Sequence, residues 1–88
     1  MNAAQLEQVR LSVLRYCESA REFGMTDPLL LQQLKSEGQR LTVEELRHEL
    51  RYLEDKGLIT TVMKFVSPEL KRWRVTADGR DFIAANLE

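Results

Sequence analysis

The segment Leu41-Thr-Val-Glu-Glu-Leu-Arg-His-Glu-Leu-Arg-Tyr-Leu-Glu-Asp-Lys-Gly-Leu-Ile59 carries the clearest structural pattern in this chain of 88 residues. Leu46, Leu50 and Leu53 follow one another at intervals of four and then three residues, which is the spacing of one face of an α-helix. This repeat predicts a helix whose apolar stripe is buried against the rest of the molecule.

Both ends of this helix are marked in the sequence. Thr42 is followed three residues later by Glu45, the capping-box pattern in which each side chain bonds the other residue's backbone amide. Gly57 suits the left-handed residue that ends a helix, and Lys56 brings positive charge to the negative end of the helix dipole. The helix is therefore expected over 42–56.

An alternating apolar and basic pattern follows directly. The run 58–66 is rich in Ile, Thr, Val and Phe, the Ser-Pro-Glu-Leu sequence at 67–70 interrupts it, and residues 71–76 resume it. β-Branched and aromatic residues bounded by a proline-containing turn are typical of strands. We therefore predict a two-stranded β-hairpin over 58–76.

Strand alternation sorts the side chains of this hairpin onto two faces. The inner face would carry Ile59, Met63, Phe65, Trp73 and Val75. Lys64, Arg72 and Arg74 would point outward. Trp73 is interpreted as a core residue beneath the hairpin, in preference to a platform on which a nucleic-acid base stacks.

The predicted first helix spans 2–23 and ends before Gly24. Its apolar stripe comprises Leu6, Val9, Val13, Tyr16, Cys17, Ala20 and Phe23. Two leucines, Leu11 and Leu14, lie off this stripe. They could form an exposed dimer interface, or Leu14 could pack on the last helix and leave Leu11 at the surface.

Two further helices complete the prediction. Met25-Thr-Asp-Pro28 is a turn and helix-start signature, in which Thr26 or Asp27 can cap a helix running to about residue 37. With the capped helix described above, it would form a helix-turn-helix pair over 27–57. Thr76 can cap a last helix over 77–87, which would turn Phe82 and Ile83 inward.

Length and composition limit the classes of protein that fit. Eighty-eight residues, 43% of them hydrophobic, predict one domain over 1–88 that is too small to enclose a deep substrate cavity. A net charge of −1 implies no overall attraction to nucleic acid, so any such affinity needs a local basic patch. The single Cys17 excludes an internal disulfide, and neither a signal peptide nor a membrane-spanning run is visible. We expect a cytoplasmic protein with no membrane partner.

Enzymatic chemistry has little support in the sequence. Cys17 lies on the stripe of the first helix, so it is interpreted as a buried small residue and not as a nucleophile. His48 is the only histidine, which leaves no metal-ligand cluster of usual spacing. No phosphate-binding glycine loop is present. We therefore predict a protein without catalytic residues, metal or cofactor.

Two motifs resemble a known family. Leu53-Glu-Asp-Lys-Gly-Leu-Ile59 leads into the hairpin and Trp73-Arg-Val-Thr-Ala-Asp-Gly79 leaves it. With the order of the elements, they resemble the winged helix-turn-helix regulators of the MarR and PadR type over about residues 26–83. The resemblance implies an α+β fold with three helices, a two-stranded wing and a C-terminal helix. It also implies that the helix at 42–56 is a recognition helix and that 66–72 is the tip of the wing.

A recognition helix would read bases through its outward side chains. With Leu46 and Leu50 turned inward, the outward positions are Glu44, Arg47, His48 and Arg51. Arginine bonds guanine bidentately in the major groove, His48 could donate to a base or a phosphate, and Glu44 could accept from cytosine. Thr42 would bond a phosphate or only cap its helix. The alternative is that Arg47 pairs with Glu44, or Arg51 with Glu54, on an ordinary solvated face.

The hairpin would supply contacts to the DNA backbone. Its basic residues are Lys64, Lys71, Arg72 and Arg74, against the single acidic residue Glu69. Three or four phosphate contacts would make the slope of log affinity against log salt roughly −3 to −4 per protomer. The alternative is a basic sheet edge whose charges only discourage association between sheets.

The predicted function is that of a sequence-specific DNA-binding regulator of bacterial or phage type, with double-stranded DNA as partner and a homodimer as a further expectation. The recognition helix itself has an excess of acid, because segment 42–57 holds five acidic residues against three basic ones. The competing prediction is therefore a winged-helix module that binds a protein partner, for which Glu44→Lys or Glu49→Lys would abolish capture and leave the fold intact. A small-molecule sensor, for which the sequence shows no pocket, is the third hypothesis.

Overall fold

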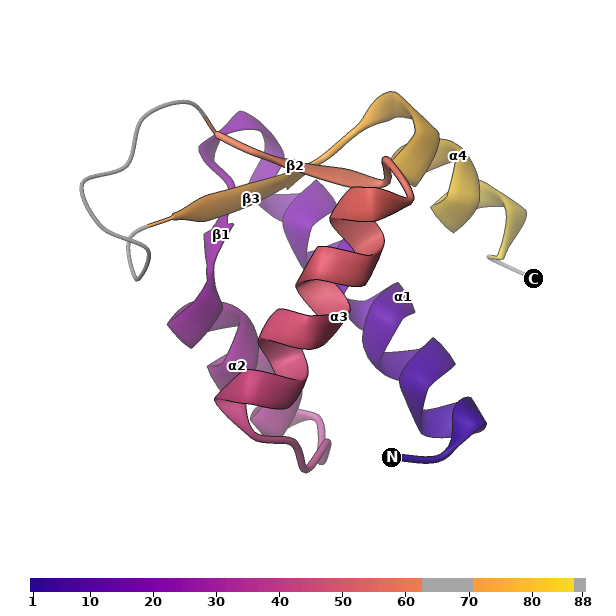
Figure 1. Ribbon diagram of the computed structural model, residues 1–88. Helices are drawn as coiled ribbons and strands as arrows, with labels where there is room; N and C mark the ends of the chain where they lie inside the picture. The colour runs from indigo at the N-terminus through magenta and orange to yellow at the C-terminus, as the bar shows by residue number, and fades with distance from the viewer. Residues whose placement is uncertain (63–70, 87–88) are drawn as a thin grey trace.

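The computed structural model describes residues 1–62 and 71–86 and has an α+β fold (Figure 1). Its elements in chain order are α1 (Ala3–Ala20), a 3-10 turn (Arg21–Phe23), β1 (Met25–Thr26), α2 (Asp27–Ser36), α3 (Val43–Asp55), β2 (Ile59–Thr61), β3 (Arg72–Val75) and α4 (Ala77–Ala85). Helices α2 and α3 pack side by side, and α1 passes behind α3 (Figure 1). The sheet lies across one end of α1 and α3, with α4 beside it.

Each helix begins at a residue whose side chain accepts a hydrogen bond from the first turn. Asn2 caps α1, Thr26 caps α2, Thr42 caps α3 and Thr76 caps α4. The predicted capping box at Thr42 and the cap at Thr76 are therefore confirmed. The first helix is shorter than the predicted 2–23, because the chain tightens into a 3-10 turn after Ala20.

The described sheet has three antiparallel strands in the order β1-β3-β2, so the prediction of a two-stranded hairpin was incomplete. Residues Met25 and Thr26, expected as a turn, pair with Trp73 and Arg72. Gly24 allows this approach: its φ is 75°, and a Cβ there would lie 2.8 Å from the Trp73 carbonyl oxygen. A two-residue strand whose partner lies far along the chain leaves no periodic pattern in the sequence.

The core forms where the three long helices meet the sheet. Its buried hydrophobic residues are Val9, Val13, Leu14, Cys17, Met25, Leu30, Leu34, Leu41, Leu46, Leu50, Leu53, Ile59, Trp73, Val75 and Ile83. The predicted stripe of α3 and the core position of Trp73 are thus confirmed. Two aromatic residues expected to face inward do not, since Phe23 is 68% exposed and Phe82 is 41% exposed. Phe23 leaves the α1 stripe because the 3-10 turn changes the helical periodicity.

The end of α3 is bonded to the start of α4. Gly57 has a φ of 76°, and the Leu58 amide donates to the Leu53 carbonyl at 3.0 Å, the pattern of a Schellman motif. The Thr76 hydroxyl donates to the Gly57 carbonyl at 2.6 Å. A Cβ on Gly79 would lie 2.2 Å from the Leu58 carbonyl oxygen, so only glycine permits this approach. These contacts give the two motifs flanking the hairpin a shared structural role.

Cys17 is fully buried in the described structure, as predicted. Burial raises the pKa of its thiol from the ordinary 9.0 to about 12. Between these values the unfolded chain ionises while the folded protein keeps its proton, so the free energy of unfolding should fall as pH rises from 9 to 12. We expect a decrease of about 1 kcal/mol per pH unit from this group, measured by urea unfolding. Cys17→Ala should make the fall of the unfolding free energy with pH shallower. If that pH dependence is unchanged in the variant, the raised pKa of the buried thiol is refuted.

Several predictions for the hairpin and one for the last helix fall outside the described residues. These are the inward positions of Met63 and Phe65, the outward position of Lys64, most of the tip at 66–72, and the last helical position at 87. Along the described strand β3, Trp73 and Val75 are buried while Arg72 and Arg74 are exposed, which confirms the predicted alternation. None of the described helices combines the length and apolar character needed to cross a bilayer.

Candidate functional site

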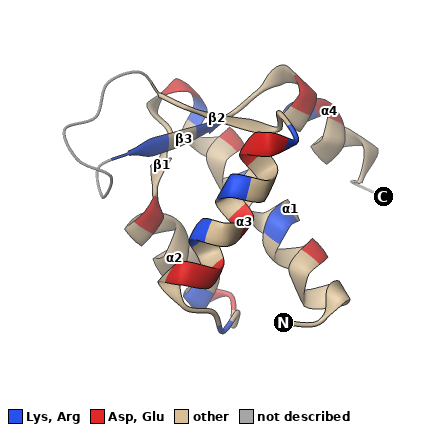
Figure 2. Ribbon diagram, in the orientation of Figure 1, with Lys and Arg blue, Asp and Glu red and all other residues tan. Residues whose placement is uncertain are grey.

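The outward face of α3 presents the four side chains predicted to read bases. Glu44, Arg47, His48 and Arg51 are all exposed, the side chain of His48 to 80% and that of Arg47 to 48%. Basic and acidic positions alternate along this helix (Figure 2). The spacing that buries the leucine stripe therefore also determines which side chains are presented to a partner.

The acidic excess of this helix does not reach its outward face. Glu45 bonds the backbone of its own capping box, and Glu49 is buried, so Glu49 is not the accessible docking residue that the protein-partner prediction required. The exposed charges of α3 and its cap are Glu44, Arg47, Arg51, Glu54, Asp55 and Lys56, in which acid and base balance. The charge count along the sequence thus overstated the repulsion that a phosphate backbone would meet.

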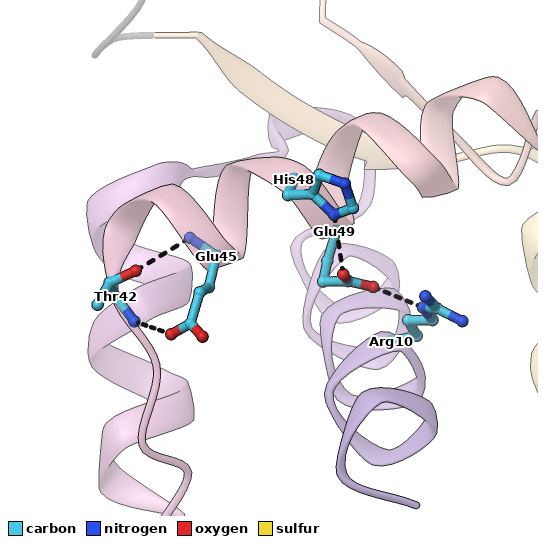
Figure 3. A network of polar contacts seen from close by, with 5 residues as sticks. All are labelled: Arg10, Thr42, Glu45, His48 and Glu49. Carbon is cyan, nitrogen blue, oxygen red and sulfur yellow. Dashed lines mark hydrogen bonds and ion pairs between the residues drawn. The ribbon is translucent and has the colours of Figure 1, made fainter. Parts of the chain in front are cut away.

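Glu49 is buried because Arg10 of α1 neutralises it (Figure 3). The Arg10 Nε atom lies 2.6 Å from Glu49 Oε1, and the Arg10 guanidinium carbon lies 3.9 Å from the centre of the Tyr52 ring. His48 Nδ1 lies 3.2 Å from Glu49 Oε2. When Nδ1 carries its proton it donates to Glu49, which leaves Nε2 as the atom available to a ligand.

Removing the arginine of this pair should destabilise the protein. We expect Arg10→Ala to lower the free energy of unfolding by roughly 2–4 kcal/mol, because a buried carboxylate would lose its ion pair. Urea unfolding measures the change, and Arg15→Ala, at an exposed position of the same helix, is the matched control. Replacing both Arg10 and Glu49 by methionine should restore most of the loss. A neutral Arg10→Ala would contradict this view of the pair.

Thr42 caps its helix, one of the two roles that the sequence left open (Figure 3). Its Oγ1 accepts from the Glu45 amide at 3.1 Å, and its own amide donates to Glu45 Oε1 at 2.8 Å. Because capping uses the hydroxyl as an acceptor, its O–H remains able to donate to a phosphate.

A buried carboxylate links α2, α3 and β3. Asp27, at the first position of α2, accepts from Trp73 Nε1 at 2.8 Å and from Arg47 Nε at 3.1 Å. Arg47 therefore pairs with Asp27, where the sequence suggested Glu44 as its alternative partner. Sequence reasoning assigned Asp27 only a possible capping role, because its two partners lie 20 and 46 residues away. An acidic residue at a helix start is a usual capping signal and does not point to a distant arginine.

These side chains border a pocket of about 300 Å³ between α3 and β3. Its lining residues are Asp27, Arg47, Leu50, Arg51, Glu54, Lys71 and Trp73. The Lys71 ammonium lies 4.5 Å from the centre of the Trp73 ring, within cation–π range. The structure thus brings together three basic residues that the sequence placed on two separate elements.

Arg74 lies elsewhere. It lines a second pocket, of about 360 Å³, with Glu18, Arg21, Glu22, Val75 and Arg80. Adjacent residues of a strand point to opposite faces, so Arg72 and Arg74 share the face opposite to Trp73. The predicted backbone contacts therefore divide into Lys71, beside the α3 arginines, and Arg72 with Arg74 on the other face. Lys64 lies outside the described residues.

The predicted dimer interface is wrong at one of its two residues. Leu14 is completely buried within the chain. The described helices α1 and α4 contact each other. Leu11 is half-buried and lines a groove of about 710 Å³ between α1, the end of α3 and α4. Phe82 and Tyr52 line the same groove. Any apolar contact surface in this region therefore includes Leu11 and Phe82, and not Leu14.

Comparison with known proteins adds no assignment, since no family model and no curated protein matches the chain. Within residues 1–62 and 71–86, no group of three or more His, Cys, Asp or Glu side chains could hold a metal ion.

Proposed function

We propose that this protein is a sequence-specific DNA-binding regulator of bacterial or phage type with a winged helix-turn-helix fold. Helix α3 would enter the major groove, and the antiparallel strands β2 and β3 would belong to the wing. The support for the fold is the order of the four helices and the antiparallel sheet, with α2 and α3 packed as neighbours. The sequence motifs at 53–59 and 73–79 support the same proposal.

One observation carries the functional part of this proposal. Arg47 and Arg51 are exposed on the outward face of α3 and share a pocket with Lys71, the residue before β3. Two guanidinium groups on one helical face suit bidentate readout of guanine, and an adjacent ammonium suits a phosphate. The inward burial of Glu49 removes the main electrostatic objection. Arg72 and Arg74 would then add backbone contacts from the other face of the wing.

A mobility-shift experiment against random duplexes at about 50 and 200 mM salt tests the proposal. With three or four phosphate contacts, the affinity should fall roughly 100-fold between the two conditions. Repeated selection should also enrich one family of sequences. Binding that is indifferent to salt, or absent at low salt, would contradict DNA binding.

A second candidate function is a protein-interaction module, and the groove beside α4 favours it. Phe82 is 41% exposed there, beside the partly buried Leu11 and Tyr52. Sedimentation over a range of concentrations tests the case in which the partner is a second copy of the chain. Phe82→Glu should then convert a dimer to a monomer, whereas a wild-type protein that is monomeric at every concentration contradicts self-association.

A further inference from the structure

Arg47 and Arg51 differ in how they are held, although both are exposed on α3. Arg47 bonds Asp27 through its Nε atom at 3.1 Å. Arg51 has no ion pair to any of the described residues. A guanidinium has five N–H donors, so a bond through Nε leaves both terminal nitrogens of Arg47 able to bond a ligand. Of the two arginines, Arg47 is thus the one with a preset orientation.

The residue that sets this orientation is itself fixed from two directions. Asp27 is buried at the start of α2, and its other oxygen accepts from Trp73 Nε1 at 2.8 Å. Trp73 lies in the central strand of the described sheet, paired with Met25 on one side and Thr61 on the other. The carboxylate therefore cannot move without disturbing β3. Figure 1 shows α2 and α3 on the same side of the sheet, with β1 leading directly into α2.

We propose that Asp27 is a specificity-determining residue that positions Arg47 for base readout. This inference rests on the proposed DNA-binding function. A side chain already held in its binding orientation loses less freedom when it binds, which favours the complex with a base that it recognises. Long-range attraction to phosphates does not depend on that orientation. Asp27 should therefore affect the preference among sequences more than the affinity for arbitrary DNA.

The variant Asp27→Asn tests this role. The side-chain oxygen of asparagine can still accept from Trp73 Nε1, but its amide group cannot accept from Arg47 Nε. We expect the ratio of affinities for a selected duplex and a shuffled duplex to fall about tenfold. Affinity for the shuffled duplex should stay equal or rise slightly, because one negative charge is lost. A purely structural defect would lower both affinities together.

Two controls make the test specific. Asp78→Asn removes an acidic residue from the first turn of α4, and Asp78 has no arginine partner among the described residues, so it should leave the ratio unchanged. In an Arg47→Ala background, Asp27→Asn should have no further effect on the ratio. The NMR signal of the Arg47 Nε–H group in the free protein should lose its protection from exchange in Asp27→Asn but not in Asp78→Asn.

The outcomes separate the two proposals. If the wild-type protein prefers one duplex and Asp27→Asn keeps the full ratio, the role of Asp27 is refuted while DNA binding stands. The role is equally refuted if Asp27→Asn lowers the ratio by the same factor with and without Arg47, or if the Arg47 Nε–H signal is unaffected. A wild-type protein that binds no duplex overturns the proposed function together with this inference.

Discussion

The double variant Arg47→Ala/Arg51→Ala should lower the affinity for a selected duplex by about two orders of magnitude, if α3 reads bases as proposed. Each good bidentate contact between arginine and guanine discriminates by about 1–3 kcal/mol. Both side chains are exposed on one face of α3 and border one pocket, so a single groove can engage both. Competition mobility shifts with selected and shuffled duplexes measure the loss.

The matched control is Arg15→Ala/Arg80→Ala, which removes the same charge from exposed positions on α1 and α4. The affinity of this control variant for DNA should fall only because two positive charges are lost. The loss should be the same for the selected and the shuffled duplex. The thermal unfolding of both double variants should be measured as well, because Arg47→Ala also removes an ion-pair partner of the buried Asp27 and could lower stability. Equal losses in the two double variants would mean that α3 contributes charge and no base recognition.

Trp73→Ala should be the most destabilising single substitution considered. The side chain is buried in the central strand, and truncation of a core tryptophan to alanine costs about 3–5 kcal/mol. The change would also remove a hydrogen-bond donor from the buried Asp27. Since native proteins are stable by only about 5–15 kcal/mol, the variant should lose a large part of the free energy of unfolding and unfold at a clearly lower temperature. Circular dichroism and urea unfolding measure this.

Trp73→Phe distinguishes the contribution of ring packing to stability from that of the indole N–H group. It keeps most of the buried apolar area but leaves Asp27 Oδ1 without the tryptophan donor, which should cost about 1–3 kcal/mol. The variants should therefore rank wild type, Trp73→Phe, Trp73→Ala in decreasing stability. Equal losses for the two variants would show that packing of the ring is not the larger contribution, and a loss below about 1 kcal/mol for Trp73→Ala would contradict its core position.

Local sequence patterns alone predicted the main features of helix α3. The leucine repeat, the capping box at Thr42 and the terminal glycine act between residues no more than five apart, and all three were confirmed. Each depends on helical geometry alone, which relates spacing in the sequence directly to position on a face. The same geometry correctly predicted which side chains of α3 are exposed.

Contacts between distant segments could not be predicted in the same way. Strand β1 exists because Gly24 lets the chain approach β3, and Glu49 is buried because Arg10 lies on the facing helix. Leu14 is buried by neighbouring helices although it lies off the predicted stripe. In each case the deciding partner is remote along the chain, so neither residue type nor spacing identifies it.

The sequence by itself determined the four helices, the alternating faces of β3 and the outward arginines of α3, because helix and strand periodicities and end caps are local properties. Only the tertiary structure decided the third strand, the balanced charge of the outward face and the carboxylate that holds Arg47. These features depend on which surfaces meet when the chain packs. Polar groups that are buried where surfaces meet form ion pairs and hydrogen bonds with partners that are remote in the sequence, and a local sequence pattern does not identify those partners.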